Sequence, residues 1–272
     1  MTAIALTIAG SDSCGGAGIQ ADIKTFSAFG VYGASVITAL TAQNTCGVTG
    51  VVPTPPGFIA KQIDAVATDL TIGAVKTGML ATRDAVLAVS ERLRHYNLHP
   101  LVVDPVMVAT SGDVLLDADA IGAVRHHLIP LADLITPNLH EAARLLDLPL
   151  ARTNEDMKAQ ASFLRSRFGA RSVLIKGGHG EGEEAVDALL VGDQFMLLAL
   201  PRLDASNTHG TGCTLSAAIA ALLALGVGMP EAVARAKRYV WQGIEAGKAL
   251  KIGNGAGPLD HLYALRKCPL PE

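Results

Sequence analysis

The chain has 272 residues; half are apolar, 17% are charged, and the formal net charge is −3 at pH 7. This length and composition predict a single large α/β domain with a sizeable core over residues 1–272. The slight negative charge and the 4% aromatic content are not typical of nucleic-acid-binding surfaces, so we expect no nucleic-acid partner.

The cysteine pattern and the hydropathy of the chain favour a protein that works in a reducing, aqueous compartment. No Cys-x-x-Cys motif occurs, which disfavours a disulfide framework or a zinc site and favours a cytoplasmic protein. No apolar run reaches the ~20 residues of a membrane-spanning helix, and the N-terminus lacks the basic start of a secretory signal. The cysteines are Cys14, Cys46, Cys213 and Cys268.

The first expected unit is a strand at residues 3–9, a Gly-rich loop at 10–18 and an amphipathic helix at 19–29. Gly16, Gly18 and Ala21 match the dinucleotide-binding fingerprint. That fingerprint requires an acidic residue about 20 positions later. None occurs between Asp22 and Asp64, so a nicotinamide site is excluded. Asp22 is either a ligand-binding carboxylate near the loop or an acid favoured by the helix N-terminus.

A second strand is expected at residues 35–39, followed by the uncharged polar segment 41–45. Within it, the Gln43 amide offers a donor and an acceptor together, which suits the edge of a heterocycle. An ordinary polar turn is an equally good interpretation of this segment. A helix starting at Pro55-Pro56 and running to residue 69 is expected next, because proline is favoured at the first helical position.

The middle of the chain alternates strands at residues 72–75 and 101–103, a strand ending at Ile135, and a helix at 83–95. The three strands end at Lys76-Thr77-Gly78-Met79, Asp104-Pro105 and the segment 136–141. Asn138 and Glu141 are three residues apart, so they share one helix face. Their oxygen atoms suit Mg²⁺ or its waters. A capping box, in which Asn138 caps the helix and Glu141 reaches back, explains the same pair.

The following segment predicts a helix at residues 153–168, a strand at 172–175 and a hairpin of 185–191 with 194–200. The strand at 172–175 ends in Lys176-Gly177-Gly178-His179. Lys176 either holds a phosphate as a point charge or is a solvated lysine at a strand end. An amphipathic helix is expected at 230–250. The Gly-rich segments 177–182 and 253–257 are candidate lids.

The most informative stretch is Asn207-Thr208-His209-Gly210-Thr211-Gly212-Cys213-Thr214, which leads into an Ala/Leu-rich segment. No charged residue occurs from Gly210 to Pro230, so we expect a buried helix. Its Gly-lined N-terminus would offer free N–H groups and the positive end of the helix dipole to an anion. We expect this dipole to lower the pKa of Cys213. The alternatives are a plain Gly-rich turn and an N-cap at Thr208.

The alternating order predicts a mostly parallel sheet with helices on both faces. In such sheets ligands bind beyond the carboxyl ends of the strands. The polar motifs occupy those ends, so we expect them to converge on one site. They are the loop from Gly10 to Gly18, Gln43, Met79, Asp104, Asn138, Glu141, Lys176 and the turn 210–213.

Taken together, these motifs resemble those of the ribokinase-like superfamily, and within it the hydroxymethylpyrimidine/phosphomethylpyrimidine kinases of thiamine biosynthesis. The resemblance covers nearly the whole chain in order. It implies a three-layer α/β/α sandwich and a homodimer. It also implies ATP-dependent, Mg²⁺-dependent phosphorylation of a small pyrimidine and of its monophosphate. The motifs that carry it are residues 9–13, 15–22, 42–45, 76–79, 104–107, 136–142, 176–179 and 207–214.

The family's roles carry over residue by residue as implications of the resemblance. The turn Gly210-Thr211-Gly212-Cys213 corresponds to the anion hole, with Cys213 at the position of the catalytic base. Asn138 and Glu141 match the motif that organises Mg²⁺. The implied nucleotide contacts are Lys176, Asp104, Thr208 and Thr211, and the implied substrate contacts are Gly10, Asp22, Gln43 and Met79.

Two positions depart from the family pattern: Cys14 stands where Ser is expected, and Asn254 stands where His or Lys is more usual. Two alternatives to the pyrimidine kinase remain. A pyridoxal kinase is the nearer one, although its relatives tend to carry Met where this chain has Gln43. The other is a non-catalytic pyrimidine-binding sensor, against which the joint presence of Cys213, Lys176 and Glu141 argues.

Overall fold

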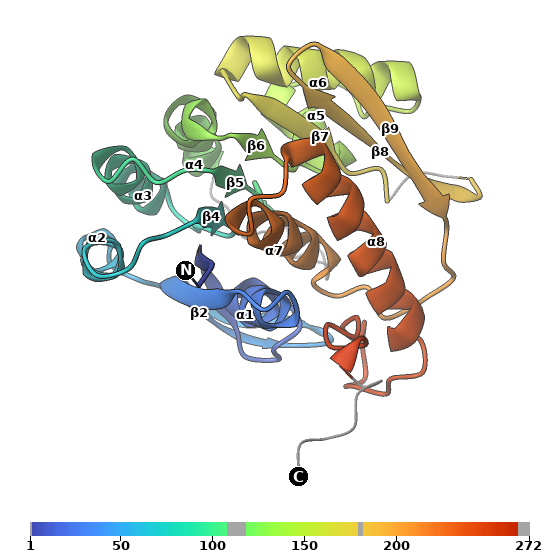
Figure 1. The fold of residues 1–272 in the computed structure, drawn as a ribbon, viewed down its shortest axis with the longest axis horizontal. Coiled ribbons are helices and arrows are strands. Elements are labelled where there is room, and N and C mark those ends of the chain that lie inside the picture. Colours follow the sequence, from blue (N-terminus) through green and yellow to red (C-terminus); the bar gives the residue numbers. More distant parts are fainter. Residues whose placement is uncertain (1, 108–117, 179–181, 266–272) are drawn as a thin grey trace.

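The structure is a computed structural model that describes residues 2–107, 118–178 and 182–265. Its strands form one sheet in the order β3-β2-β1-β4-β5-β6-β7-β8-β9 (Figure 1). The strands from β2 through β1, β4, β5 and β6 to β7 are parallel, and antiparallel pairing occurs at β2–β3, β7–β8 and β8–β9. The predicted mostly parallel α/β sheet is therefore confirmed. The strands are β1 Ile4–Asp12, β2 Tyr32–Asn44, β3 Gly47–Pro53, β4 Ala74–Thr77, β5 Leu101–Val103, β6 Leu134–Ile135, β7 Ser172–Ile175, β8 Glu184–Val191 and β9 Gln194–Pro201.

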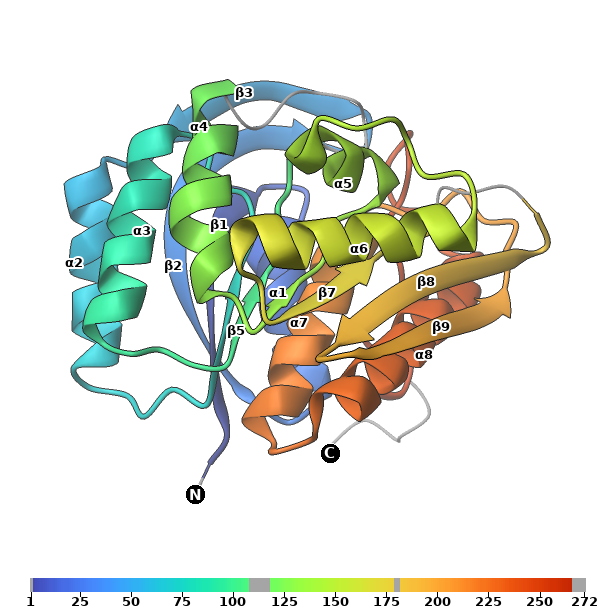
Figure 2. The same cartoon turned by 90° about the horizontal axis from the view of Figure 1, so that it is seen from above.

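Helices cover both faces of this sheet, and α2, α3 and α4 lie side by side on one of them (Figure 2). Two short helical segments, Val124–Leu128 and Ile129–Leu131, lead from α4 into β6. The helices are α1 Gly18–Ala28, α2 Pro56–Ala67, α3 Arg83–His95, α4 Ala118–Ala123, α5 Leu139–Leu146, α6 Asn154–Phe168, α7 Thr211–Ala224 and α8 Met229–Gly247.

Strand alternation divides the interior into two cores. In β5, Leu101 and Val103 pack in the core beneath α2 to α6, whereas Val102 packs in the core beneath α1, α7 and α8. Successive side chains of a strand point to opposite faces, so a fully apolar strand of this kind serves both layers. This three-layer arrangement is the α/β/α sandwich expected from the sequence.

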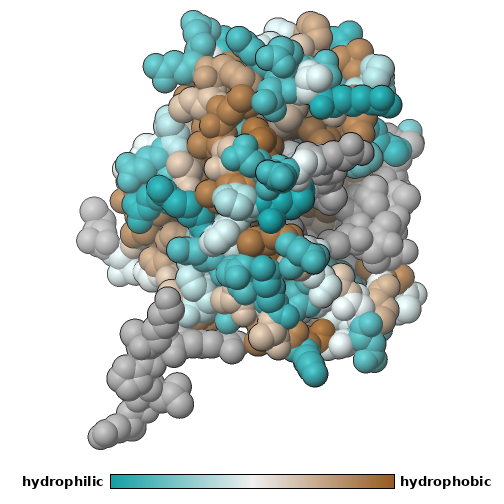
Figure 3. All heavy atoms as spheres, turned by 90° about the vertical axis from the view of Figure 1, so that its right-hand side faces the viewer, coloured by the Kyte–Doolittle hydropathy of each residue, from teal (hydrophilic) through white to brown (hydrophobic). Residues whose placement is uncertain are grey.

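Helix α7 is the most buried helix, as its uncharged sequence predicts. Every residue from Thr214 to Leu222 is buried, and the helix contacts α1, α8 and the strands β1, β4 and β5. The packing leaves only its first turn facing the carboxyl ends of those strands. On the outside of the protein, by contrast, the face shown in Figure 3 carries hydrophilic and hydrophobic side chains mixed together.

The structure corrects several expected boundaries. Residues 10–12 extend β1 instead of opening the loop, and residues 41–44 extend β2 instead of forming a turn. The extended β2 pairs with β3, a strand that the sequence did not indicate. Most residues of β3 are exposed, so it lacks the buried run that marks inner strands such as β5 and β7. No helix in the described part of the chain is long and apolar enough to cross a membrane.

Candidate active site

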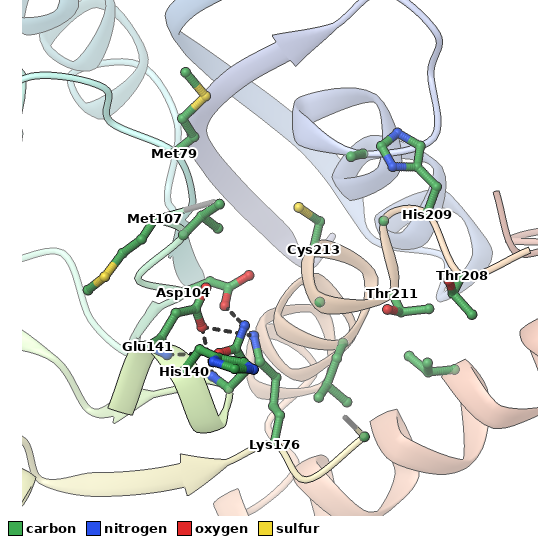
Figure 4. A pocket seen from close by; sticks show the side chains of 18 of the residues that line it. Met79, Asp104, Met107, His140, Glu141, Lys176, Thr208, His209, Thr211 and Cys213 are labelled. Carbon is green, nitrogen blue, oxygen red and sulfur yellow. Dashed lines mark hydrogen bonds and ion pairs between the residues drawn. The ribbon is translucent and has the colours of Figure 1, made fainter. Parts of the chain in front are cut away.

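One cavity of about 1030 Å³ opens at the carboxyl ends of the parallel strands, beside the first turn of α7 (Figure 4). The predicted convergence is confirmed, because every predicted site residue except Asp22 lines this cavity. The lining residues from that prediction are Gly10, Gln43, Met79, Asp104, Asn138, Glu141, Lys176, Thr208, Gly210, Thr211, Gly212 and Cys213.

The N-terminus of α7 has no side-chain cap. The N-cap residue is Gly210, with φ +79°, and not Thr208. A Cβ atom at Gly210 would lie 1.8 Å from the backbone oxygen of Gly16, so the Gly-rich loop before α1 and the turn before α7 touch backbone to backbone. Only glycine combines this close approach with a positive φ. The first-turn N–H groups and the positive end of the helix dipole therefore border the cavity.

Lys176 supplies a fixed positive charge next to that helix end. Its Nζ atom lies 2.8 Å from Asp104 Oδ1 and 3.8 Å from Glu141 Oε2. A Cβ atom at Gly212 would lie 3.3 Å from the same Nζ, which places the ammonium group against the first turn of α7. Although burial lowers the pKa of Lys176, the two carboxylates raise it to about 12. Lys176 is therefore a cation at neutral pH.

Asp104 is held as a buried carboxylate. Besides Lys176, it accepts hydrogen bonds from Thr136 Oγ1 at 3.0 Å and from Ser216 Oγ at 3.2 Å. Although burial raises the pKa of Asp104, Lys176 and Lys76 lower it below its ordinary value. The negative charge of Asp104 thus fixes the position of Lys176.

Asn138 and Glu141 form the capping box that the sequence offered as an alternative to a metal site. Asn138 Oδ1 accepts from the Glu141 N–H at 2.8 Å, and Glu141 Oε2 accepts from the Asn138 N–H at 2.7 Å. Burial raises the pKa of Glu141 to about 7, which Lys176 opposes and Asp104 reinforces. The capping box does not remove the pair from the cavity, since both residues line it.

The oxygen atoms at this end of the cavity fit a Mg²⁺ ion that is held mainly by the phosphates of a bound substrate. Glu141 and Asp104 offer carboxylate oxygens, and Asn138 offers an amide oxygen, at the same end of the cavity. The described residues contain no group of three or more His, Cys, Asp or Glu side chains that could hold a metal ion. Mg²⁺ commonly binds one or two carboxylates, several waters and substrate phosphates, so a complete protein cage is not required.

The structure corrects the expected thiolate at Cys213. Burial raises the pKa of this thiol to about 11, even though Lys76 lowers it. Desolvation of the charged form, with the nearby charges of Asp22 and Asp104, outweighs the effect of the lysine. Cys213 is therefore a protonated thiol at neutral pH, with its side chain at the first turn of α7 (Figure 4).

Asp22 is also corrected, because it does not line the cavity. It is fully buried, accepts a hydrogen bond from Thr7 Oγ1 and forms an ion pair with Lys76 at 2.8 Å. Lys76 does line the cavity, and sequence reasoning gave it no role. A Cβ atom at Gly78 would lie 2.8 Å from Lys76 Nζ, so this glycine makes room for the ammonium group. The Lys-Thr-Gly-Met motif at a strand end was the available signal.

A second pair that sequence reasoning missed joins the end of β1 to the turn before α7. Asp12 Oδ2 lies 2.9 Å from His209 Nε2 and accepts from the N–H groups of Gly16 and Ala17. Its other oxygen accepts from the Cys14 N–H at 2.8 Å. Asp12 and His209 thus order the Gly-rich loop and dock it on the turn before α7. Both residues belong to the motifs 9–13 and 207–214, but the sequence does not indicate that the Asp12 carboxylate pairs with His209.

The end of the cavity beyond Lys176 combines apolar side chains with a buried ion pair. Lys237 Nζ lies 2.7 Å from Asp187 Oδ2, and Asp187 Oδ1 accepts from the Gly177 N–H at 2.9 Å. The sequence did not indicate this region, because its residues come from β8, β9 and α8. The apolar lining residues are Leu200, Pro201, Leu203, Val240, Trp241 and Ile244.

Comparisons with known proteins agree with this geometry. A family model described as phosphomethylpyrimidine kinase matches residues 12–260. A hydroxymethylpyrimidine/phosphomethylpyrimidine kinase of Rhizobium meliloti is 54% identical over 97% of this chain and 98% of its own length. A kinase of the same name from Escherichia coli is 49% identical over 96% and 97%.

This chain belongs to the phosphomethylpyrimidine kinase family. Membership makes it an enzyme of the kinase class that acts on a small-molecule substrate. Among solved structures, phosphomethylpyrimidine kinase from Clostridium difficile is 46% identical, with a TM-score of 0.78, over 89% of this chain and 99% of its own. An ADP complex of Bacillus subtilis pyridoxal kinase is 37% identical, with a TM-score of 0.89, over 98% and 99%.

The two positions that depart from the family pattern lie beside the cavity and do not line it. The Asn254 N–H donates to Thr45 Oγ1 at 3.1 Å, so the segment 253–257 packs on the turn between β2 and β3. Cys14 belongs to the Gly-rich loop, and burial raises the pKa of its thiol. Cys268 and residues 179–181 of the predicted lid at 177–182, which include His179, lie outside the described residues.

Proposed function

We propose that this chain transfers the γ-phosphoryl group of ATP to the hydroxymethyl group of 4-amino-5-hydroxymethyl-2-methylpyrimidine, and then a second group to the monophosphate. The observation that carries the proposal is the shared cavity. It joins an uncapped helix N-terminus and Lys176 to a small pocket lined by Gly10, Gln43 and Met79. The cavity thus offers one region suited to phosphate groups and one suited to a small heterocyclic acceptor.

The phosphate end is proposed at the turn 210–213 and Lys176. Phosphoryl transfer requires alignment and charge stabilisation more than covalent chemistry from the protein. Backbone N–H groups at the first turn of α7 suit the anionic oxygens of a triphosphate. Lys176 adds a full positive charge, and Thr208 and Thr211 add hydroxyl groups at the cavity wall. Asp104 acts on the nucleotide through the position it gives to Lys176.

Magnesium is proposed between the nucleotide phosphates and the capping box of α5. Glu141 would contact the ion or its waters, with Asn138 and Asp104 as neighbouring oxygen donors. When bound, Mg²⁺ neutralises phosphate charge and aligns the triphosphate. The protein would hold these oxygen atoms close to Lys176 and leave some of them free to contact the ion or its waters.

The proton of the attacking hydroxyl is proposed to pass to the thiolate form of Cys213, a minor form at neutral pH, which becomes the thiol. The first-turn position of this residue puts it between the phosphate end and the substrate pocket of the cavity. Since burial raises its pKa to about 11, the thiol is a weak acid and its thiolate a strong base. Loose phosphoryl-transfer transition states need little help from a base early in the reaction. Cys213 would therefore matter most for alignment and for the late proton transfer.

The nucleoside end is proposed at the apolar region beside Lys237. Flat apolar surfaces from Pro201 and Trp241 suit a purine base, and Asp187 with Lys237 fixes the glycine segment that leads out of β7. A likeness to pyridoxal kinase complexes with ADP supports the same use of the fold.

Pyridoxal kinase is the second candidate, and the structural neighbours favour it. Pyridoxal kinases have TM-scores of 0.88 to 0.89 to this chain but identities of 35–37%. The pyrimidine kinases are 46–54% identical. Gln43 offers an amide to an aminopyrimidine edge, which supports the pyrimidine as the main substrate.

We also propose the domain organisation, the oligomeric state and the location of the chain. The chain acts as a single kinase domain, as a homodimer and in the cytoplasm, where ATP and small pyrimidines are dissolved. The length of 272 residues and the family resemblance support these statements. No nucleic acid or membrane partner is proposed.

The deciding experiment measures ATP consumption with Mg²⁺ on hydroxymethylpyrimidine, its monophosphate and pyridoxal in parallel. We expect the monophosphate to yield the diphosphate. Turnover of pyridoxal alone would move the activity to the vitamin B6 series. Binding of all three without turnover would support the sensor and contradict the kinase. A Lys176→Met variant is the control for contaminating kinases, since it should lose activity with each substrate.

A further inference from the structure

The side chains of Thr41 and Gln43 lie next to each other on the cavity face of β2. Both line the cavity and are half-buried, whereas the intervening Ala42 is exposed. Residues two apart in a strand share a face, which explains their contact. The pairing of β2 with β3 shifts register between Ala42 and Gln43. Irregularities of this kind re-aim side chains next to functional sites.

Two oxygen atoms compete for the single hydrogen of the Thr41 hydroxyl. Thr41 Oγ1 lies 2.8 Å from the backbone oxygen of Ser11 and 3.0 Å from Gln43 Oε1. A backbone carbonyl can only accept, so the shorter contact uses the hydroxyl hydrogen. The contact with Gln43 is then favourable only if the amide donates. An amide turned by 180° about its last bond does so, because Nε2 and Oε1 exchange places.

The backbone of Gln43 is fixed independently of its side chain. Ser13 Oγ donates to the Gln43 carbonyl oxygen at 2.8 Å and accepts from the Gln43 N–H at 2.9 Å. The remaining freedom of Gln43 lies in its side-chain torsions. A single neighbouring hydroxyl can therefore decide which end of the amide faces the cavity.

We propose that Thr41 is a specificity-positioning residue that accepts a hydrogen bond from Gln43 Nε2 and thereby presents Gln43 Oε1 to the substrate. The site then selects a heterocycle whose edge carries a hydrogen-bond donor, such as an exocyclic amino group. It disfavours the same ring with an oxo group at that position, because two acceptors would face each other. This proposal rests on the proposed function and extends it to the recognition of one ring substituent.

The test compares hydroxymethylpyrimidine with its 4-oxo analogue in the wild-type protein and in two variants. The wild type should prefer the amino compound in KM by about 10- to 100-fold, the size expected for one mismatched hydrogen bond. In Thr41→Val the amide is free to turn, so the preference should fall to about threefold or less. Thr41→Ser keeps the hydroxyl and should keep the preference. The KM for ATP should stay the same in all three proteins.

A third variant tests the orientation itself. Gln43→Glu keeps an acceptor towards the cavity, and Thr41 can donate to the other carboxylate oxygen only by giving up its hydrogen bond to the Ser11 carbonyl. If Oε1 faces the substrate, this variant should retain binding of the amino compound within about tenfold. A loss of that binding by much more than tenfold would show that the substrate edge needs the Nε2 donor, and would overturn the proposal.

Failure of the inference is separable from failure of the proposed function. Calorimetry of the two compounds gives their affinity ratio even without turnover, whereas phosphorylation of the amino compound tests the function alone. An unchanged amino-to-oxo ratio in Thr41→Val, in a protein that still phosphorylates the amino compound, would overturn the role of Thr41 and leave the kinase intact. A lower thermal stability of Thr41→Val without a change in the ratio would equally assign Thr41 a structural role only.

Discussion

The ammonium group of Lys76 lies 2.8 Å from Asp22 Oδ2, and neither side chain is exposed. Burial opposes the charge on Lys76, but the surrounding acidic groups, Asp22 first, raise its pKa above the ordinary value. The pair therefore places a permanent cation under the first turn of α7. The carboxylate that the sequence assigned to the substrate is the internal partner of this cation.

Removing the cation alone should unfold the protein more easily than removing both charges. Lys76→Met leaves Asp22 buried without a partner, and we expect a loss of about 3–5 kcal/mol in the free energy of unfolding. The double variant Lys76→Met/Asp22→Asn should recover most of this stability. Urea denaturation measures both values, with the exposed Lys61→Met as control. Equal stability of the single variant and the control would show that the pair is not coupled.

Activity should depend on Cys213 and rise with pH. Cys213→Ala should lower kcat by about 10²–10⁴-fold, as for loss of a general base, while ATP binding survives. Because its pKa of about 11 lies above the assay range, the thiolate fraction increases tenfold per pH unit below that value. We therefore expect kcat/KM to rise between about pH 7 and 10. The exposed Cys46→Ala is the matched control, and turnover of Cys213→Ala near the wild-type rate would contradict a role for the thiol.

Glu141 should make the metal-free protein less stable as the pH rises. Its pKa of about 7 in the folded state exceeds the ordinary value of 4.5, so the folded protein binds a proton that the unfolded chain has lost. Stability from this group is present below about pH 4.5 and falls as the pH rises to 7. Glu141→Gln keeps the capping box and removes the titration.

The measurement is the difference in unfolding free energy between Glu141→Gln and the wild type at pH 5 and pH 8, with EDTA present. We expect the variant to gain on the wild type by on the order of 2–3 kcal/mol over this interval. The exposed Glu91→Gln should show no such trend. A difference that does not change with pH would mean that Glu141 titrates normally.

Gly210 and Gly226 provide a pair with the same backbone conformation and different surroundings. Their φ values are +79° and +81°, but an added Cβ would lie 1.8 Å from Gly16 O at the first and would meet nothing within 4 Å at the second. Gly226→Ala should cost about 1–2 kcal/mol from the backbone alone. Gly210→Ala should cost several kcal/mol and abolish phosphate binding, because the Gly16 loop must move. Similar thermal stability of the two variants would rule out the close contact.

Local signals predicted those elements whose ends are marked in the sequence. The bounds of α3, β5 and β7 agree with prediction, because caps and short continuous apolar runs define them. The predicted start at residue 153 also agrees with the structure, where the Thr153 side chain caps α6 by accepting from the Asp156 N–H. In contrast, β3 is an exposed edge strand without a hydrophobic pattern, and it pairs with β2 because the chain turns back on itself after Asn44.

The membership of the site was predictable, but the environment of each residue was not. Parallel strands end at one edge of the sheet, which brought Met79, Asp104 and Lys176 together. Asp22 shares its helix face with the buried residues Ile19 and Phe26, so the same periodicity that predicted α1 already pointed it inward. For Cys213, the sequence showed the helix end but not the burial that raises the pKa of the thiol, because burial depends on packing.

The contact between Gly16 and Gly210 also sets when the enzyme can begin to work. These residues are made near the beginning and towards the end of translation; Gly210 lines the cavity, as do Ala17 and Gly18 next to Gly16. A nascent chain that stops short of α7 holds a substrate loop with no helix end to dock against. The wall formed by these two loops is therefore completed only after most of the chain has left the ribosome.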